Sequence, residues 1–442
     1  MFDSIISALR ATEGAHDWLV QHVRKNSTQL YVIGGRTESS RRVTAERYAV
    51  TVMNDHPAGR DQNAEARGEA DVSLLPGDLP LLQSKINQAV FMATLTDNVP
   101  FGLPGPAKYP AVAVSDPEIQ TAPWELAERT VHQLLDSLRH ESHIRLSSAE
   151  VFVDESHITL QNSRGAAGSK VETDVLLDVV LLATNKNDEM ESHIALERRR
   201  AADLDVPLVA QRQAQFARDA LAASTPQTGT FPVVVSDEAL AELLMSGGDS
   251  PLLFRSSAQA KYQQMTPWEI DSSVLLEPPT GDPITLYSNS LLAYGARSAS
   301  FDREGHPGQR VLIIDNGVLR AFWAPMRYAQ YLNVPATGHF GNMELAAGSQ
   351  PVKSLLQGDG PFYHILAFSA MSPDPITGDF VGEIRLGYEV EHGSSRPVKG
   401  GSISGNLFSV LAAAQLSRET VMLGDYQGPR AMRFAAITVA GA

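Results

Sequence analysis

Histidine and glutamate residues lie close together at two places where metal binding has to be considered. The first is the run His140-Glu141-Ser142-His143, and the second is Glu191-Ser192-His193. Imidazole and carboxylate groups are zinc ligands. However, histidines three residues apart at the end of a predicted helix are more typical of a solvated C-terminal cap that complements the helix dipole. The chain has twelve histidines, so one further chance pairing is expected. We therefore predict no metal site at either place.

The last third of the chain holds three polar segments. Residues 300–308 carry Asp302, Arg303, Glu304 and His306 between predicted strands. Such a cluster either lines a functional groove or belongs to a charged hairpin that orders a loop, and both interpretations stay open. Residues 377–380 predict a turn in which an aspartate, Asp379, accepts hydrogen bonds from backbone N–H groups.

Residues 399–407 form the third polar segment, Lys399-Gly400-Gly401-Ser402-Ile403-Ser404-Gly405-Asn406-Leu407. A phosphate-binding loop would need Lys-Ser/Thr directly after its last glycine, and this segment lacks that pair. The chain also has no Gly-x-Ser-x-Gly sequence where a strand leads into a helix, so a serine hydrolase has no support.

These three segments occur in a fixed order behind the strand-like run Gly229-Thr230-Phe231-Pro232-Val233-Val234-Val235. The ordered set resembles the TldD/PmbA family, whose members pair into heterodimeric metallopeptidases that act on unfolded peptides. Further short segments of the same family pattern are spread over most of the chain. The resemblance implies an α+β fold, with an N-terminal domain of a sheet and long helices and a C-terminal β-rich domain of mixed sheets.

The zinc-binding motif of that family is missing. Catalytic members carry His-Glu-x-x-x-His on the helix after this strand, and here the three positions hold Met245, Ser246 and Ser250. A thioether and two hydroxyls supply neither zinc ligands nor a carboxylate to take a proton from bound water. Catalytic members also carry a cysteine near the C-terminus, and this chain has none. The resemblance is therefore to the PmbA branch, also called TldE, which implies no cofactor in this chain and zinc in a TldD-like partner.

The resemblance also implies a function and partners. The expected function is a non-catalytic subunit that shapes the peptide channel of a two-chain metallopeptidase, as a heterodimer with a TldD-like chain or a homodimer in its absence. A stand-alone binding or scaffold protein and an enzyme with a relocated metal site remain as alternatives, so enzymatic activity of this chain alone stays open. The residues expected at the channel or an interface are Asp302, Glu304, Gly305, Thr377, Gly378, Asp379, Gly401, Ser404, Gly405 and Asn406.

Charge and composition limit the other classes of function. The chain has 36 basic and 51 acidic residues, a net charge of −15 and a pI near 5.3. Direct binding to nucleic acid is not expected, because that affinity comes from clustered basic residues. The family name refers to modulation of DNA gyrase, but the sequence has no basic footprint for DNA. We expect no membrane segment and no signal peptide, and hence a cytoplasmic protein.

The predicted elements divide the chain into two domains. We expect domains at 1–223 and 229–442, separated by the turn-rich linker 224–229. The N-terminal domain is predicted to contain helices and strands and a long, charged helix over Glu191–Ala223, with Val99–Pro117 as a surface loop. The C-terminal domain is predicted to be mostly strands, including Ser273–Glu277, with Asp315-Asn316-Gly317 as a hairpin turn.

Overall fold

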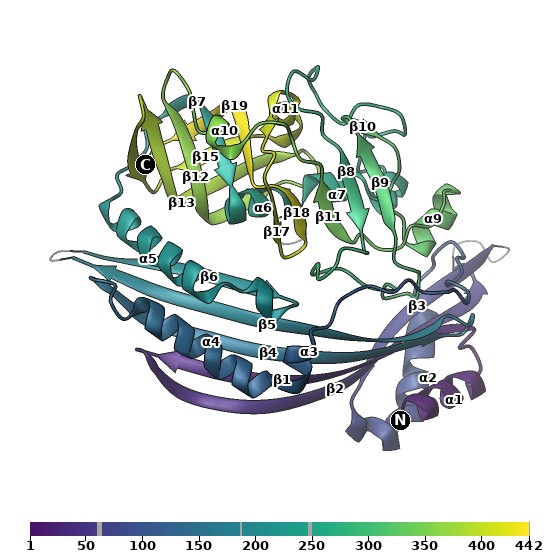
Figure 1. The fold of residues 1–442 in the computed structure, drawn as a ribbon. Coiled ribbons are helices and arrows are strands. Elements are labelled where there is room, and N and C mark those ends of the chain that lie inside the picture. The colour runs from purple at the N-terminus through teal and green to yellow at the C-terminus, as the bar shows by residue number, and fades with distance from the viewer. Residues whose placement is uncertain (60–63, 186–187, 246–249, 442) are drawn as a thin grey trace.

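The structure is a computed structural model that describes residues 1–59, 64–185, 188–245 and 250–441. A long curved sheet formed by the N-terminal half lies beneath a β-rich body formed by the C-terminal half (Figure 1). The predicted α+β class is confirmed. The division into domains at 1–223 and 229–442 agrees with this arrangement of sheets and stays a prediction.

The N-terminal sheet has six strands in the order β3-β2-β1-β4-β5-β6. All neighbouring strands are antiparallel. The strands are β1 (Asp17–Ile33), β2 (Arg36–Pro57), β3 (Glu65–Leu74), β4 (Ile144–Asn162), β5 (Ala167–Thr184) and β6 (Glu189–Arg198).

The two faces of this sheet differ in polarity, because successive side chains of a strand point to opposite faces. Val151, Val153, Val175 and Leu177 are buried in a core that includes helix residues on one face. On the other face the acidic residue Asp154 of β4 lies opposite Asp174 of β5, and neighbouring positions are also polar. The polar face is the one that contributes to the cavities shared with the C-terminal body.

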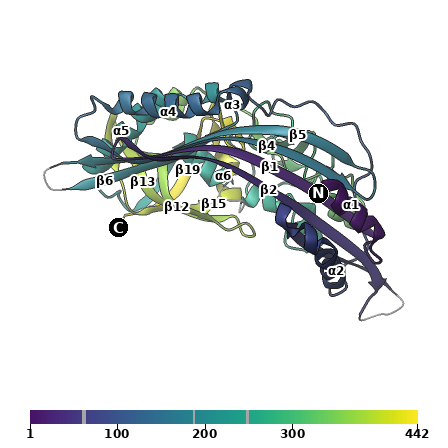
Figure 2. The ribbon, with the colours of Figure 1, turned by 90° about the horizontal axis from the view of Figure 1, so that it is seen from below.

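The described residues of the N-terminal half form five α-helices: α1 (Phe2–Ala11), α2 (Leu82–Ala93), α3 (Pro117–Thr121), α4 (Pro123–Leu138) and α5 (Val206–Ala222). Leu126, Val131 and Leu134 of α4 pack on the apolar face of the sheet. Helices α1 and α2 pack at the β1–β3 end, where Ile5 and Ile86 join a second core. Figure 2 shows α4 running along the sheet and α1 and α2 at its other end.

The C-terminal body contains two sheets. One has the order β12-β7-β19-β15-β13-β14, with β16 also paired to β19, and the other has the order β10-β9-β8-β11-β18-β17. The strands of the first are β7 (Gly229–Ser236), β12 (Phe362–Pro373), β13 (Asp379–Glu391), β14 (Ser394–Val398), β15 (Ser402–Asn406), β16 (Gln415–Leu416) and β19 (Ala431–Ala440). The strands of the second are β8 (Leu286–Asn289), β9 (Arg310–Asp315), β10 (Val318–Leu319), β11 (Asn342–Leu345), β17 (Thr420–Leu423) and β18 (Tyr426–Pro429).

Short helices connect these strands. They are α6 (Asp237–Met245), α7 (Pro251–Arg255), α8 (Ala258–Tyr262), α9 (Met326–Leu332), α10 (Val352–Leu355) and α11 (Leu407–Val410). The predicted hairpin at Asn316-Gly317 is confirmed, because these residues have φ values of 49° and 77° and connect β9 to β10. Within the described ranges, no helix is long and apolar enough to cross a membrane.

The prediction of one long helix over Glu191–Ala223 is wrong. The first part of this range belongs to strand β6, which pairs with β5. Ser192 and Leu196 are buried and alternate with exposed charged residues, which is the period of a strand. The helix begins only at Val206, where the Asp205 side chain accepts a hydrogen bond from the Leu208 N–H.

Two further expectations differ from the structure. Residues 99–116 contain no helix or strand, as predicted, but they do not form a surface loop, because Phe101, Leu103 and Val114 are buried. This segment crosses from α2 to α3 and contacts the C-terminal body. The predicted strand at Ser273–Glu277 is wrong as well: the structure has a single β-bridge there, from Ser273 to Val318.

Candidate functional site

A cleft lies between the polar face of the N-terminal sheet and the C-terminal body. It contains two cavities of about 540 and 510 Å³. Both cavities are lined by Gln259, Arg303, Trp323 and His339, so they adjoin at these side chains. A cleft between packed units that combines apolar walls with a few convergent polar groups is the usual form of a binding site.

Asp302 organises the loop at the junction of the two cavities. Its Oδ1 atom accepts hydrogen bonds from the backbone N–H groups of Glu304 and His306, both at 2.9 Å. Gly305 has φ of 90°, a conformation that favours glycine, and its carbonyl accepts a hydrogen bond from the Tyr109 hydroxyl at 3.0 Å. The loop is therefore fixed from within and by a residue of the 99–116 segment.

The second oxygen of Asp302 positions His339. Asp302 Oδ2 accepts hydrogen bonds from the backbone N and from Nδ1 of His339, both at 3.0 Å. His339 Nε2 in turn accepts a hydrogen bond from Arg303 Nε at 2.8 Å. This pattern requires the neutral tautomer of His339 with its proton on Nδ1. Burial favours protonation of Asp302, but its interactions with His339 and with the backbone N–H of His306 together outweigh burial and hold the Asp302 pKa below its usual value.

Glu304 completes the polar cluster. Its Oε1 atom lies 3.9 Å from His339 Nε2. Burial raises the pKa of Glu304, and the nearby Asp302 charge adds to this rise. Asp302, Glu304 and His339 are the one group found among the described residues whose ligand atoms all lie within 4.8 Å of one another, as a metal site requires. Both ring nitrogens of His339 already have hydrogen-bond partners, so a metal ion would have to displace Arg303.

On the sheet side of the cleft lies an ion pair between the two halves of the chain. Glu69 of β3 forms an ion pair with Arg327 of α9, with 3.1 Å between Oε2 and Nη1. Arg327 also lies over the ring of Phe101, 4.6 Å from its centre. Burial raises the pKa of Glu69 in spite of the attraction of Arg327. These contacts join the N-terminal sheet to the C-terminal body at the wall of the larger cavity.

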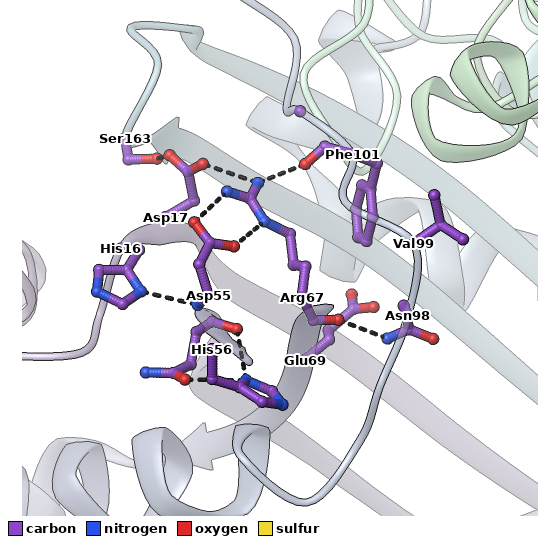
Figure 3. A network of polar contacts seen from close by, with 12 residues as sticks. His16, Asp17, Asp55, His56, Arg67, Glu69, Asn98, Val99, Phe101 and Ser163 are labelled. Atoms are coloured by element: carbon purple, nitrogen blue, oxygen red, sulfur yellow. Dashed lines mark hydrogen bonds and ion pairs between the residues drawn. The ribbon is translucent and has the colours of Figure 1, made fainter. Parts of the chain in front are cut away.

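A buried network around Arg67 holds this wall in place (Figure 3). The Arg67 guanidinium donates to Asp55 at 2.6 and 2.8 Å, to Asp17 at 2.9 Å and to the Phe101 carbonyl. The Asn98 side chain donates to the Arg67 carbonyl at 3.0 Å. The network therefore ties β3 to the start of the 99–116 segment and fixes Phe101 beside the cleft.

The positions of the family's zinc motif have other roles in this chain. Met245, the last residue of α6, is 6% exposed and belongs to the C-terminal core. Ser250 is 0% exposed, and its Oγ accepts a hydrogen bond from the Leu253 N–H at the start of α7. Ser246 lies outside the described residues. A core thioether and a hydroxyl used as a helix cap do not fit zinc, so the residues present do not support the family's metal site.

Of the other groups considered as ligands, His193 and Glu141 have structural partners. His193 Nε2 lies 3.1 Å from Asp178 on the neighbouring strand. Glu141 accepts a hydrogen bond from Arg218 of α5. The first is a cross-strand pair, and the second joins the turn after α4 to α5.

The sequence-predicted site residues fall into two groups. Asp302, Glu304 and Gly305 belong to the loop at the cleft. Seven residues lie elsewhere in the C-terminal body, in or directly before strands β13 and β15, and do not line either cavity: Thr377, Gly378, Asp379, Gly401, Ser404, Gly405 and Asn406.

The second group forms a turn and the strands beside it. Asn406 donates to Asp379 and to the Thr377 carbonyl, both at 2.9 Å. The backbone N–H groups of the turn are capped by Asp374 and not by Asp379 as predicted, because Asp374 Oδ1 accepts from Ile376 and Thr377 at 2.8 and 2.7 Å. Their role at a channel or interface stays a prediction.

The sequence alone does not place three residues of the cleft, His339, Glu69 and Arg327, in one site with Asp302. His339 lies 37 positions after Asp302, and no local spacing links them. Glu69 and Arg327 come from different halves of the chain, 258 positions apart. Ala336-Thr337-Gly338, directly before His339, is one of the further short segments that resemble the family, but it does not link His339 to Asp302.

Residues 228–441 match the sequence model of the PmbA/TldA metallopeptidase C-terminal domain. The fold and this match define a protein of the TldD/TldE-like, metallopeptidase-related class. The chain belongs to the TldD/PmbA family.

Sequence relatives cover only part of the chain. An uncharacterized protein of Methanocaldococcus jannaschii is 28% identical over 156 residues, which is 33% of this chain and 36% of the relative. A protein of Saccharolobus solfataricus named zinc metalloprotease TldD homolog is 25% identical over 215 residues, which is 44% of this chain and 45% of the relative. The chain thus matches less than half of the length of these curated relatives.

Solved structures match over the whole chain. TldE from Thermococcus kodakarensis superimposes with a TM-score of 0.83 at 17% identity and covers 100% of both chains. A putative modulator of a DNA gyrase from Thermotoga maritima gives 0.83 at 16% identity, again over 100% of both chains. At these identities the likeness establishes the fold.

Proposed function

We propose that this chain is a TldE-like subunit without its own zinc, which forms one wall of the peptide channel of a two-chain metallopeptidase. The observation that carries the proposal is the use of the motif positions: Met245 is a core residue and Ser250 is a helix cap. The partner would be a TldD-like chain with the His-Glu-x-x-x-His motif. The site of action would be the cytoplasm.

The cleft supports the part of the proposal that concerns the peptide. It is bounded by β3, an edge strand of the N-terminal sheet, and Asp71, Val72 and Ser73 of this strand line the larger cavity. An edge strand offers unpaired N–H and C=O groups that can pair with an extended chain. Such pairing depends little on side chains, which suits unfolded peptides of varied sequence.

The test is peptidase activity in a reconstituted pair. Hydrolysis of unfolded casein is measured with this chain alone, with a motif-bearing homologue alone and with both. We expect cleavage only when the homologue is present, and none when the glutamate of its motif is replaced by glutamine. Cleavage by this chain alone that a chelator abolishes would contradict the proposal.

A relocated metal site is the second candidate, and the Asp302, Glu304 and His339 cluster is the observation in its favour. Elemental analysis of the purified chain distinguishes the two. The proposed subunit should hold far less than one zinc per chain. A stoichiometric zinc that is lost in His339→Gln would support the relocated site.

A further inference from the structure

The basic side chains of the cleft differ in how their charges are balanced. Four of them line the two cavities. Three form ion pairs: Lys170 with Glu172 at 2.8 Å, Arg297 with Asp425 at 2.7 Å and Arg327 with Glu69 at 3.1 Å. Within the described part of the chain, the fourth, Arg303, has no carboxylate at ion-pair distance.

Arg303 is nevertheless held in position. Its Nε atom donates to His339 Nε2 at 2.8 Å, and Asp302 fixes the ring of His339. The two terminal nitrogens of Arg303 make no hydrogen bond to any residue that the structure describes. They belong to a side chain that lines both cavities. A guanidinium with its Nε anchored and its two terminal nitrogens free presents parallel N–H groups, which match the two oxygens of a carboxylate.

The surrounding charges favour an anion on one side of Arg303. The 510 Å³ cavity is lined by three basic side chains and a single carboxylate, that of Asp302. The Asp302 carboxylate already accepts hydrogen bonds from the backbone N–H groups of Glu304, His306 and His339. The 540 Å³ cavity instead carries several acidic groups in its wall. Because Glu172 and Asp425 balance Lys170 and Arg297, Arg303 is the basic side chain of this cavity that has no carboxylate at ion-pair distance among the described residues.

From this geometry we infer that Arg303 is the receptor for a carboxylate of the peptide held in the cleft. The inference rests on the proposed function, because it names the chemistry of one end of that peptide. The carboxylate would enter from the 510 Å³ cavity, and the peptide would extend toward the cavity bounded by β3. The carboxylate can be the C-terminal group of the peptide or an acidic side chain, and the experiment separates these sources.

The test compares three fluorescein-labelled, unstructured peptides of about ten residues in fluorescence anisotropy with the full chain. The first has a free C-terminal carboxylate, the second has a C-terminal carboxamide, and the third has the carboxamide and one internal glutamate. A charge-assisted, bidentate hydrogen bond is worth roughly tenfold to a hundredfold in affinity. We expect the free acid to bind tighter than the carboxamide by a factor in that range.

Substitutions assign this preference to Arg303. In Arg303→Met the acid and carboxamide peptides should bind alike. In Arg303→Lys the preference should be intermediate, because a lysine keeps the charge but loses the planar fork. The matched control is Arg139→Met, which removes the same charge from a side chain that is 68% exposed just after the end of α4. It should leave the preference unchanged, and circular dichroism of each variant verifies folding.

Each outcome has a distinct meaning. If the glutamate peptide equals the free acid and loses this advantage in Arg303→Met, the receptor is supported with a side chain as its ligand. If acid and carboxamide peptides bind the wild-type chain equally, the inference is overturned while the proposed function stands. If none of the three peptides binds, the peptide-binding part of the proposed function fails, and the inference fails with it.

Discussion

At the scale of single residues, one carboxylate at the cleft controls several groups. Asp302 caps two backbone N–H groups with one oxygen and fixes His339 with the other. His339 then accepts a hydrogen bond from Arg303, so the orientation of a cation depends on an aspartate that does not touch it. The sequence shows Asp302, Arg303 and Glu304 as one polar run, but it cannot show His339, because only the folded chain brings residues 302 and 339 together.

The zinc motif cannot be restored simply by changing its three residues. Ser250 is 0% exposed and caps α7, so Ser250→His would remove a cap and force a larger side chain into a packed site. Loss of a cap costs about 1 kcal/mol and overpacking costs about 1–3 kcal/mol. We expect Ser250→His to lower the free energy of unfolding in urea by roughly 2 kcal/mol or more.

The matched control for this prediction is Ser250→Ala, which removes the cap without adding volume. It should cost only about 1 kcal/mol. Equal stabilities of Ser250→His and the wild-type chain would mean that the site has room for an imidazole. The argument that this position is committed to packing would then be wrong.

At the scale of elements, the sequence predicted those segments whose period is regular and whose neighbours are close in the chain. In strand β5 buried and half-buried residues alternate, and in helix α4 the buried residues lie on one stripe, so both elements have a regular period. The sequence of β6 predicts a helix because it is rich in charged residues. The alternation that identifies a strand, with Ser192, Ile194 and Leu196 on the less exposed face, extends over only a few positions. Its pairing with β5 decides the conformation, and that pairing is a tertiary effect.

The polar face of the same sheet contains an acidic pair in which Asp154 is buried and Asp174 is half-buried. Asp174 of β5 lies opposite Asp154 of β4, near the buried Arg199. Burial raises the pKa of Asp174 to about 7 in spite of the attraction of Arg199, and the nearby carboxylates add to this rise. Tyr294 and other residues of the C-terminal body line a small cavity together with Asp174. The pKa of Asp174 therefore depends on how closely the C-terminal body covers this face of the sheet.

The raised pKa predicts a pH dependence of stability. The folded pKa of Asp174 lies above the unfolded value of about 3.9, so the folded state binds the proton more tightly. Its contribution to stability is complete below about pH 4 and is lost as the pH rises to about 7. Asp174→Asn cannot ionise, so its advantage in unfolding free energy over the wild-type chain should be larger at pH 8 than at pH 5, by on the order of 2 kcal/mol.

Urea unfolding at the two pH values measures this difference. The control is Asp136→Asn, because Asp136 is 65% exposed at the end of α4 and water screens its charge. Its effect on stability should be nearly the same at both pH values. If the difference in unfolding free energy between Asp174→Asn and the wild-type chain were also the same at both pH values, Asp174 would be solvated in the folded protein, and the prediction would be wrong.

At the scale of the whole molecule, the charge of −15 should act on any peptide before it reaches the cleft. Acidic residues on the polar face of the sheet add to this field, and Arg303 acts only at short range. The two effects are separable: long-range attraction changes the association rate and falls with salt, whereas a hydrogen-bonded anchor mainly changes dissociation.

This separation gives a kinetic prediction. A lysine-containing, unstructured peptide should associate several-fold more slowly at roughly 500 mM than at 50 mM salt, because added ions screen the attraction. A peptide of net negative charge should show the opposite trend. Stopped-flow anisotropy measures both rates. Arg303→Met should leave the salt dependence almost unchanged, since it alters the net charge by one unit, while it speeds dissociation of peptides with a free carboxylate. An association rate of the cationic peptide that did not respond to salt would show that the peptide does not meet the acidic surface on its way to the cleft.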